Sequence, residues 1–305
     1  MNRSTPSSRR LWNWQGKAAP YLFLLPAGLL FVVFLAYPLA WSLVLSFYKS
    51  AGPRTHVFVG TKNYQFLLRD LVFWRAVLNT LVYTVLYLLF YIPLSLGLAL
   101  LLNSPAVRFR NMFRFAFFSS YLVGNVFVAV IFSLLLQPRT GLVNRMIGTV
   151  VPWIGNEINW RGNARLVLPA ILMGSLWISI GYGMIYFLAA LQGVDHELYE
   201  AAQVDGAGRW SKFWHITLPG IRPVLIFILL VGTISSLQLF ELPYVLFDPP
   251  TGPGMSALTI VMYLYQEGFQ AGNIGYAAAI GWVLVLMISV IALAQIRITG
   301  AAREV

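Results

Sequence analysis

Long apolar runs alternate with short polar connections along the chain. Six runs are each about 20 residues or more, which is long enough for a helix to cross the hydrocarbon core of a bilayer. They lie at residues 21–48, 77–102, 113–136, 166–191, 224–242 and 276–296. The pattern predicts an all-α, polytopic membrane protein with six transmembrane helices, and an even number of spans places both termini on one side.

The two ends of the chain are polar. Residues 1–20 combine basic residues with Ser and Pro, so we expect a disordered cytoplasmic tail there. A cleavable signal peptide is the alternative, but the apolar run that follows is too long and lacks a small-residue cleavage site. Residues 21–297 then form the transmembrane domain, in which Pro26 and Pro38 are expected to kink the first helix. Residues 298–305 form a second cytoplasmic tail.

Composition supports the membrane class, because 59% of the residues are hydrophobic and only 10% are charged, whereas a soluble domain carries about 25% charged residues. The chain has no cysteine and three histidines, so neither a disulfide framework nor a metal centre is indicated. The net charge of +11 is spread over short loops, without the basic helix typical of nucleic-acid binding. No catalytic constellation and no cofactor site is indicated, so we do not expect an enzyme.

The polar segment 195–220, between the fourth and fifth apolar runs, is the most distinctive part of the sequence. We call it the elbow. Asp195 is a good cap for a first short helix, which Gly206 should end. Arg209 to His215 can form a second short helix, and Pro219 is expected to close it because proline cannot continue a helix.

The elbow resembles the EAA loop of permease subunits of ATP-binding-cassette importers. The matching positions are Glu200-Ala201-Ala202, Gly206, Ile216 and Leu218-Pro219. Asp205, Trp210 and Phe213 resemble the carbohydrate-importing, maltose-type branch of that family, as do Leu25-Pro26, residues 60–64 and Asn79-Thr80. The similarity covers nearly the whole chain and departs from the usual pattern in the Gly- and Pro-rich loop near residue 250.

This resemblance implies a function and a set of partners. It implies a permease that carries a sugar or oligosaccharide and forms the path with a second, homologous but different permease. Two cytoplasmic ATPase subunits and an extracytoplasmic solute-binding protein would complete the importer in the cell (inner) membrane of a bacterium or archaeon. Energy would come from the ATPases, because the chain lacks the GxxxxGK[ST] phosphate-binding loop. The ATPase-coupling residues implied in the cytoplasmic coupling helix are Glu200, Ala201, Ala202, Asp205 and Gly206.

Orientation follows mainly from that resemblance. With both termini cytoplasmic, twelve of the 21 basic residues lie inside and nine lie in the longer outer loops, which is a modest positive-inside bias. The outer loops are then residues 49–76, 137–165 and 242–275. In the second of these, residues 142–154 can lie flat on the membrane or form a small helix, and the third should be dominated by turns.

Polar side chains at membrane depth are candidates for a solute path. Ser175, Ser179 and Tyr182 share one face of the fourth span at spacings of four and three, and Ser235, Gln238 and Glu241 recur every three residues in the fifth. The resemblance also places the sugar path near Tyr182 and residues 235–239. The predicted path residues are Ser175, Ser179, Tyr182, Ser235, Ser236, Gln238 and Leu239, although the serines could equally form interhelical hydrogen bonds.

Two further sets of polar and aromatic residues are more typical of packing between helices than of sugar binding. Asn79, Tyr83, Tyr87 and Tyr91 repeat every four residues along the second span, and Tyr121 and Asn125 form a similar pair in the third. Such aromatic stripes can stack on sugar rings, but interhelical packing is the more common role. Trp177 and Trp282 are expected to be packing or interfacial residues.

Two other interpretations stay open. A stand-alone secondary transporter or channel would need charged residues buried in the spans, for which Glu241 is the only candidate, and no internal repeat is evident. Within the importer family that the elbow resembles, the solute could be a glycerol phosphate ester or another polyol. A membrane enzyme lacks an acid, base and nucleophile in any plausible combination.

Overall fold

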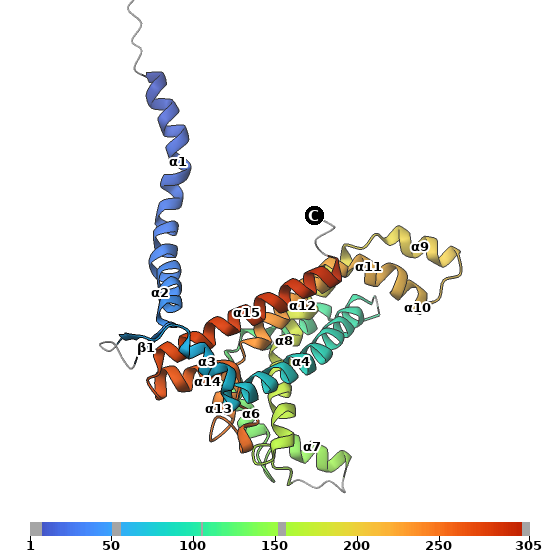
Figure 1. The fold of residues 1–305 in the computed structure, drawn as a ribbon. Helices are drawn as coiled ribbons and strands as arrows, with labels where there is room; N and C mark the ends of the chain where they lie inside the picture. The colour runs from blue at the N-terminus through green and yellow to red at the C-terminus, as the bar shows by residue number, and fades with distance from the viewer. Residues whose placement is uncertain (1–7, 51–55, 105, 152–156, 301–305) are drawn as a thin grey trace, which may run out of the picture. The chain divides into compact units, whose positions relative to one another are not determined.

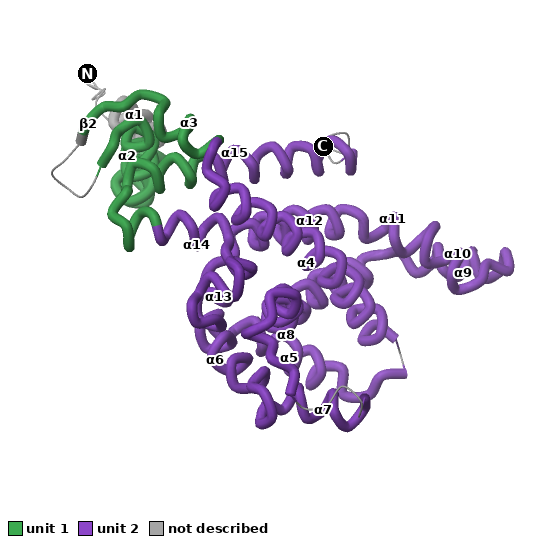
Figure 2. The backbone as a smooth tube through the Cα atoms, turned by 60° about the horizontal axis from the view of Figure 1, so that its bottom comes forward, with its two compact units in different colours: residues 1–68, 267–282 green, residues 69–266, 283–305 purple. Residues whose placement is uncertain are grey.

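The structure, a computed structural model, describes residues 8–50, 56–104, 106–151 and 157–300 and is mainly helical, as predicted (Figure 1). The chain forms two compact units (Figure 2). Unit 1 comprises residues 1–68 and 267–282, and unit 2 comprises residues 69–266 and 283–305. All the residues predicted to form the elbow and the solute path belong to unit 2.

Four helices in the described part of the chain are long and apolar enough to cross a membrane. They cover Ala19–Leu45, Leu71–Asn103, Ala164–Gln192 and Ile274–Thr299. Two bent helix pairs also qualify, Arg110–Leu122 with Asn125–Leu135 and Arg209–Gly220 with Arg222–Leu237. Counting each bent pair as one span gives the predicted six.

Unit 1 begins with a long helical run and a small sheet. Helix α1 (Ser8–Phe31), the π turn η1 (Val32–Ala36) and helix α2 (Tyr37–Leu45) form the run. The prediction of a disordered tail up to residue 20 was therefore wrong from Ser8 onward: the residues from there to the first span can continue its helix. The π turn, a common cause of helix bending, lies between the two prolines that were expected to kink this span.

A β-hairpin that the sequence analysis did not predict follows in unit 1. Strands β1 (Tyr48–Ser50) and β2 (His56–Phe58) pair antiparallel, and helix α3 (Lys62–Arg69) comes next. The side chain of Asn63 donates hydrogen bonds to the carbonyls of Ser46 and Tyr48, at 2.8 and 3.0 Å, and so fixes α3 against the end of α2. The described residues of the predicted first outer loop thus form an ordered substructure.

Helices α4 (Leu71–Asn103) and α8 (Ala164–Gln192) form the centre of unit 2. The side chain of Asp70 accepts hydrogen bonds from the backbone N–H groups of Val72 and Phe73, so α4 begins before the predicted residue 77. Gly183 of α8 lets the two helices approach closely, because a Cβ atom there would lie 2.7 Å from the Ser95 hydroxyl and 2.8 Å from that of Tyr91.

The third predicted span is not continuous, which corrects the sequence analysis. Helix α5 (Arg110–Ser119) and the 3-10 turn η2 (Ser120–Leu122) meet helix α6 (Asn125–Leu135) at 101°. Extended backbone at Val123 and Gly124 makes the break. The break falls inside the apolar run at residues 113–136, so hydropathy alone did not reveal it.

The fifth predicted span is also shorter than expected. Helix α12 (Arg222–Leu237) ends before Gln238, and Glu241 opens a separate helix, α13 (Glu241–Leu246). The expectation that Ser235, Gln238 and Glu241 lie on one face of one helix was therefore wrong. At its other end, α12 is tied to α15 (Ile274–Thr299) by a 2.6 Å hydrogen bond from the Arg222 guanidinium to the Thr299 carbonyl.

The second and third outer loops are folded as well. Helix α7 (Leu142–Val150) confirms the small helix in the second loop, and residues 152–156 lie outside the described residues. The third loop contains the 3-10 turn η5 (Pro253–Met255), helix α14 (Ile260–Tyr265) and the π turn η6 (Gln266–Gln270). Buried Leu258 and hydrogen bonds from Asn79 to the carbonyls of Met255 and Leu258 fix the loop on α4, so it is not only a set of turns.

Candidate solute cavity

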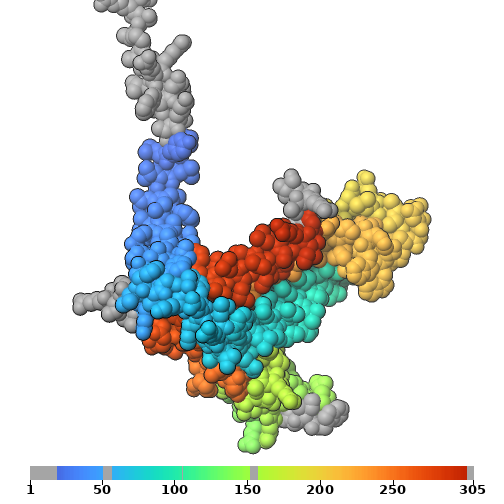
Figure 3. Space-filling model, in the orientation of Figure 1, coloured from blue at the N-terminus to red at the C-terminus, as the bar shows by residue number. Residues whose placement is uncertain are grey.

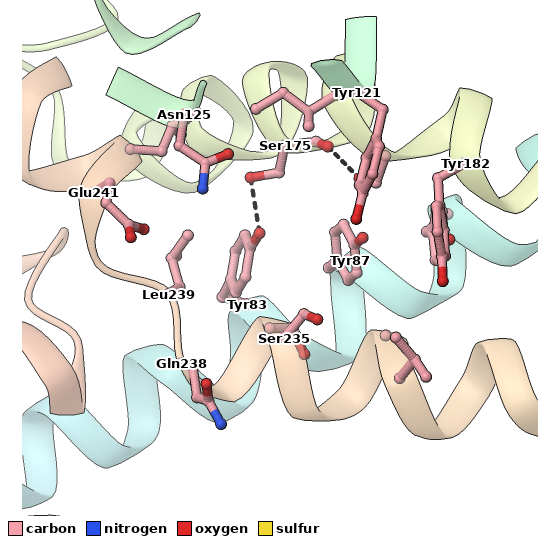
Figure 4. A pocket seen from close by; sticks show the side chains of 17 residues that line it. Tyr83, Tyr87, Tyr121, Asn125, Ser175, Tyr182, Ser235, Gln238, Leu239 and Glu241 are labelled. Atoms are coloured by element: carbon pink, nitrogen blue, oxygen red, sulfur yellow. Dashed lines mark hydrogen bonds between the residues drawn. The ribbon is translucent and has the colours of Figure 1, made fainter. Parts of the chain in front are cut away.

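A cavity of about 290 Å³ lies within unit 2, between α4, α8, α12 and the broken third span (Figure 4). Its wall combines hydroxyl, amide and aromatic side chains with a few aliphatic ones. The lining residues are Tyr83, Tyr87, Tyr91, Tyr121, Asn125, Ser175, Ile178, Ser179, Tyr182, Val231, Gly232, Ser235, Ser236, Gln238, Leu239, Glu241 and Leu242. Such a wall offers both hydrogen-bond donors and acceptors, together with flat apolar faces.

Helix α8 supplies the predicted triad of Ser175, Ser179 and Tyr182. The Tyr83 hydroxyl of α4 donates a hydrogen bond to the Ser175 hydroxyl, at 2.8 Å, and both side chains are buried. The Ser179 hydroxyl donates to the Ser175 carbonyl one turn earlier. Ser175 therefore joins two helices and lines the cavity at once, so for this residue the two roles that the sequence left open do not exclude each other.

Stacked tyrosines form two sides of the cavity. On α4, Tyr83 stacks on Tyr87 with ring centroids 5.8 Å apart, and Tyr87 stacks on Tyr91 at 5.1 Å. From the broken third span, Tyr121 stacks on Tyr182 of α8 at 4.7 Å. Offset stacking holds each ring in one orientation. The hydroxyl and ring edges facing the cavity are consequently preorganised.

The end of α12 and the residues after it place the remaining predicted residues in the cavity wall. Ser235 and Ser236 lie in the last turn of the helix, and Gln238 follows its final residue. The Leu239 carbonyl accepts a 2.7 Å hydrogen bond from the Thr259 hydroxyl of the third outer loop. This contact fixes the short segment between α12 and α13 that carries Gln238 and Leu239 into the cavity wall.

All seven residues predicted for the solute path line this one cavity. The structure brings the three residues of α8 together with four residues at positions 235–239, which lie more than 50 positions later in the sequence. Their part in solute passage stays a prediction. The cavity also includes Tyr83, Tyr87, Tyr91, Tyr121 and Asn125, for which packing was the favoured role; their regular spacing in the sequence was the available signal. Asn79, from the same stripe, instead binds the outer loop.

The elbow forms a separate protrusion of unit 2 (yellow in Figure 3). Helix α9 (His196–Val204) starts with Asp195 as its cap, and the Asp195 side chain accepts a hydrogen bond from the Glu197 N–H at 3.0 Å. Gly206 follows the helix with a φ of +74°, a conformation that favours glycine. Both features confirm the predicted helix boundaries.

The second arm of the elbow differs from the prediction at its end. Helix α10 (Arg209–Lys212), the π turn η4 (Phe213–Thr217) and helix α11 (Leu218–Gly220) form one helical run. The run therefore extends past the predicted His215, and it ends at Gly220, one residue after Pro219, where a 68° bend separates it from α12. The Tyr199 and Thr217 hydroxyls, 2.9 Å apart, link the two arms.

The proposed coupling residues are accessible. The Glu200 side chain is 71% exposed, and its Oε1 lies 3.9 Å from the Nε2 of His196 one turn before it. Ala201, Asp205 and Gly206 are exposed and Ala202 is half-buried, so this side of α9 is open to another protein. No group of three or more potential His, Cys, Asp or Glu metal ligands occurs in the described part of the chain.

A helical membrane protein with a polar cavity between its apolar helices has the architecture of a transport permease. The chain belongs to the family described as "Binding-protein-dependent transport system inner membrane component", which it matches over residues 16–299. This family assignment confirms the resemblance noted in the elbow.

Relatives and a solved structure agree with this assignment. The chain is 38% identical to the arabinooligosaccharides transport system permease protein AraP of Bacillus subtilis (strain 168), over 97% of this chain and 95% of that protein. It is 35% identical to the lactose transport system permease protein LacF of Rhizobium radiobacter, over 99% and 98%. Its fold matches a chain of a bacterial ABC transporter involved in the import of the acidic polysaccharide alginate, with a TM-score of 0.81, 29% identity and coverage of 96% and 99%.

Proposed function

We propose that this chain is one permease subunit of an ATP-driven importer for a sugar or oligosaccharide. The observation that carries the proposal is the cavity wall, in which hydroxyl and amide groups alternate with tyrosine rings. A sugar presents hydroxyls in many directions and one apolar ring face, and such a wall is complementary to both. The names of the relatives, which transport arabinooligosaccharides and lactose, support the same class of solute.

The charge of the cavity argues against the phosphate-ester alternative. None of the residues that line the cavity is a lysine or an arginine, and phosphate recognition usually relies on these cations. A stand-alone transporter coupled to ions is also disfavoured, because the family is binding-protein-dependent. A neutral polyol or saccharide is the solute that the cavity suits best.

The elbow would couple this path to the ATPases. We place Glu200, Ala201, Ala202, Asp205 and Gly206 at the contact with a cytoplasmic ATPase subunit. With six spans, that placement makes both termini cytoplasmic, with tails at residues 1–20 and 298–305 flanking a transmembrane domain at 21–297. ATP-driven closure of the two ATPases would move the elbow, and α8 and α12, which flank it, would carry the movement to the cavity.

Reconstitution tests the function directly. The chain, a second permease, the two ATPases and the binding protein encoded beside them are assembled in proteoliposomes, and uptake of radiolabelled arabinooligosaccharides, lactose and glycerol 3-phosphate is measured. We expect ATP-dependent accumulation of a saccharide that needs the binding protein. Accumulation of glycerol 3-phosphate alone, or uptake without ATPases, contradicts the proposal.

A further inference from the structure

One acidic side chain stands out among the neutral groups of the cavity. Glu241 is the only Asp, Glu, Lys or Arg that lines it. It opens helix α13, and its carboxylate points into the cavity on the side of Asn125 and Leu239 (Figure 4). Within the described residues, Glu241 forms no ion pair, and its side chain is exposed to the cavity.

The local fold explains why this carboxylate faces the cavity. Helix α12 ends at Leu237, and residues 238–240 are non-helical before α13 begins at Glu241. On α13, Leu242, Pro243 and Leu246 are buried, and Leu242 packs near Gly174 of α8. Burial of that apolar face leaves Glu241, at the first position of the helix, directed away from the core. The position is thus set by packing and not by a partner for the charge.

An unpaired charge in such a place acts over the whole cavity. The surrounding helices are apolar, so the field of the carboxylate is screened less than it would be in bulk water. It attracts cations, repels anions, and accepts charge-assisted hydrogen bonds from neutral hydroxyl groups. Like charges brought together in a site of this kind are strongly disfavoured.

We infer that Glu241 makes the permease itself selective for solute charge: neutral saccharides and amino sugars enter the cavity, whereas uronates and sugar phosphates are excluded. This inference rests on the proposed function for the identity of the solute, but the electrostatic effect can be measured without any transport. The fold does not impose such a preference, because a chain of the same fold belongs to an importer of an acidic polysaccharide.

The absence of cysteine from the sequence allows a direct test. Ser235, which is exposed on the cavity wall, is changed to cysteine in the complete reconstituted importer. Its reaction rates with a cationic (trimethylammonium-ethyl) and an anionic (sulfonato-ethyl) methanethiosulfonate are then compared. Mass spectrometry of this chain alone excludes cysteines of the partner subunits.

The ratio of the two rates reports the potential in the cavity. We expect Glu241→Gln to lower the cationic-to-anionic ratio at least about tenfold, because Coulomb's law already gives this change for one charge several ångströms away at the dielectric constant of water. Glu157→Gln removes an equal charge from an exposed pair with Arg139 in the second outer loop and should leave the ratio unchanged. A cysteine at Gln238 provides a second reporter if the Ser235→Cys double variant assembles poorly.

The outcomes separate the inference from the proposed function. An unchanged ratio in Glu241→Gln at both reporter positions overturns the role of Glu241. Solute entry is then tested with the neutral reagent methyl methanethiosulfonate. Glucosamine, glucose or glucuronate is added at the same millimolar concentration, and the protection of the cysteine against the reagent is measured. We expect glucosamine to protect most and glucuronate least. If Glu241→Gln lowers the ratio but no sugar protects the cysteine, the electrostatic role of Glu241 is supported and the proposal that saccharides bind in this cavity is contradicted.

Discussion

The Tyr83 hydroxyl donates a hydrogen bond to the Ser175 hydroxyl, and this 2.8 Å contact joins α4 to α8 at the cavity wall. Tyr83→Phe removes the donor and keeps the ring, so the stacking on Tyr87 remains. We expect a loss of stability of about 0.5–1.5 kcal/mol, seen as a lower midpoint of thermal unfolding in detergent. Tyr37→Phe, on an exposed face of α2, is the matched control. Equal midpoints for the two variants would show that the contact contributes nothing.

Glycine at position 181 allows α8 to touch the backbone of α5. A Cβ atom there would lie 1.9 Å from the Phe117 carbonyl oxygen. Gly181→Ala should therefore force the helices apart and abolish a monodisperse peak in size-exclusion chromatography. Gly97→Ala in α4 places its methyl group in open space and should stabilise by up to about 1 kcal/mol. Similar behaviour of the two variants would contradict the close packing of α5 on α8.

Two cavity residues are expected to affect uptake without affecting assembly. Tyr182→Ala removes a stacked ring, and Gln238→Ala removes an amide at the end of α12, so both should reduce sugar uptake at least tenfold. ATP hydrolysis stimulated by the binding protein should be largely retained, because the elbow is unchanged. Tyr21→Ala, an exposed residue of α1, controls for loss of an aromatic ring. Normal uptake in both cavity variants would direct attention to the tyrosine stripe of α4 or to the second permease.

The elbow variants should fold and remain stable but lose both transport and the ATP hydrolysis that the binding protein stimulates. The Glu200–His196 pair is exposed and 3.9 Å apart, so Glu200→Ala should leave thermal stability unchanged. Loss of a charge-assisted contact with the ATPase is expected to weaken coupling by about 1.5–3 kcal/mol. Gly206→Leu forces a bulky residue into a left-handed conformation and should act in the same direction. If both variants transport and hydrolyse ATP at normal rates, this segment does not couple ATP hydrolysis to transport.

Orientation can be tested with reporter fusions. A reporter fused after Ala207, in the elbow, should report the cytoplasm, and one fused after Thr251, in the third outer loop, should report the outside. Alkaline phosphatase, active outside the cell membrane, and green fluorescent protein, fluorescent inside, give complementary signals. The reverse pattern would place the elbow on the side opposite to the ATPases and remove the proposed coupling.

The sequence was informative wherever local chemistry decides the structure. Asp195 and Gly206 define helix α9 because a cap and a left-handed glycine act within a few residues. Hydropathy located the apolar spans but not the break at Val123 and Gly124, since the break falls inside one long apolar run. The sequence also could not distinguish packing from a cavity for Tyr83. The Tyr83 side chain packs between helices and also lines the cavity, and this depends on where α8 lies in the fold.

Helix α8 runs without interruption from the second outer loop to the elbow, which begins three residues after its last residue, Gln192. Ser175 lies 17 residues before that end, or about 25 Å along a helix that rises 1.5 Å per residue. A tilt of about 10° around a pivot at the elbow therefore displaces Ser175 by about 4 Å. In the proposed coupling, helix α8 would act as a lever of fixed length, and a small rotation at the elbow would change the width of the cavity.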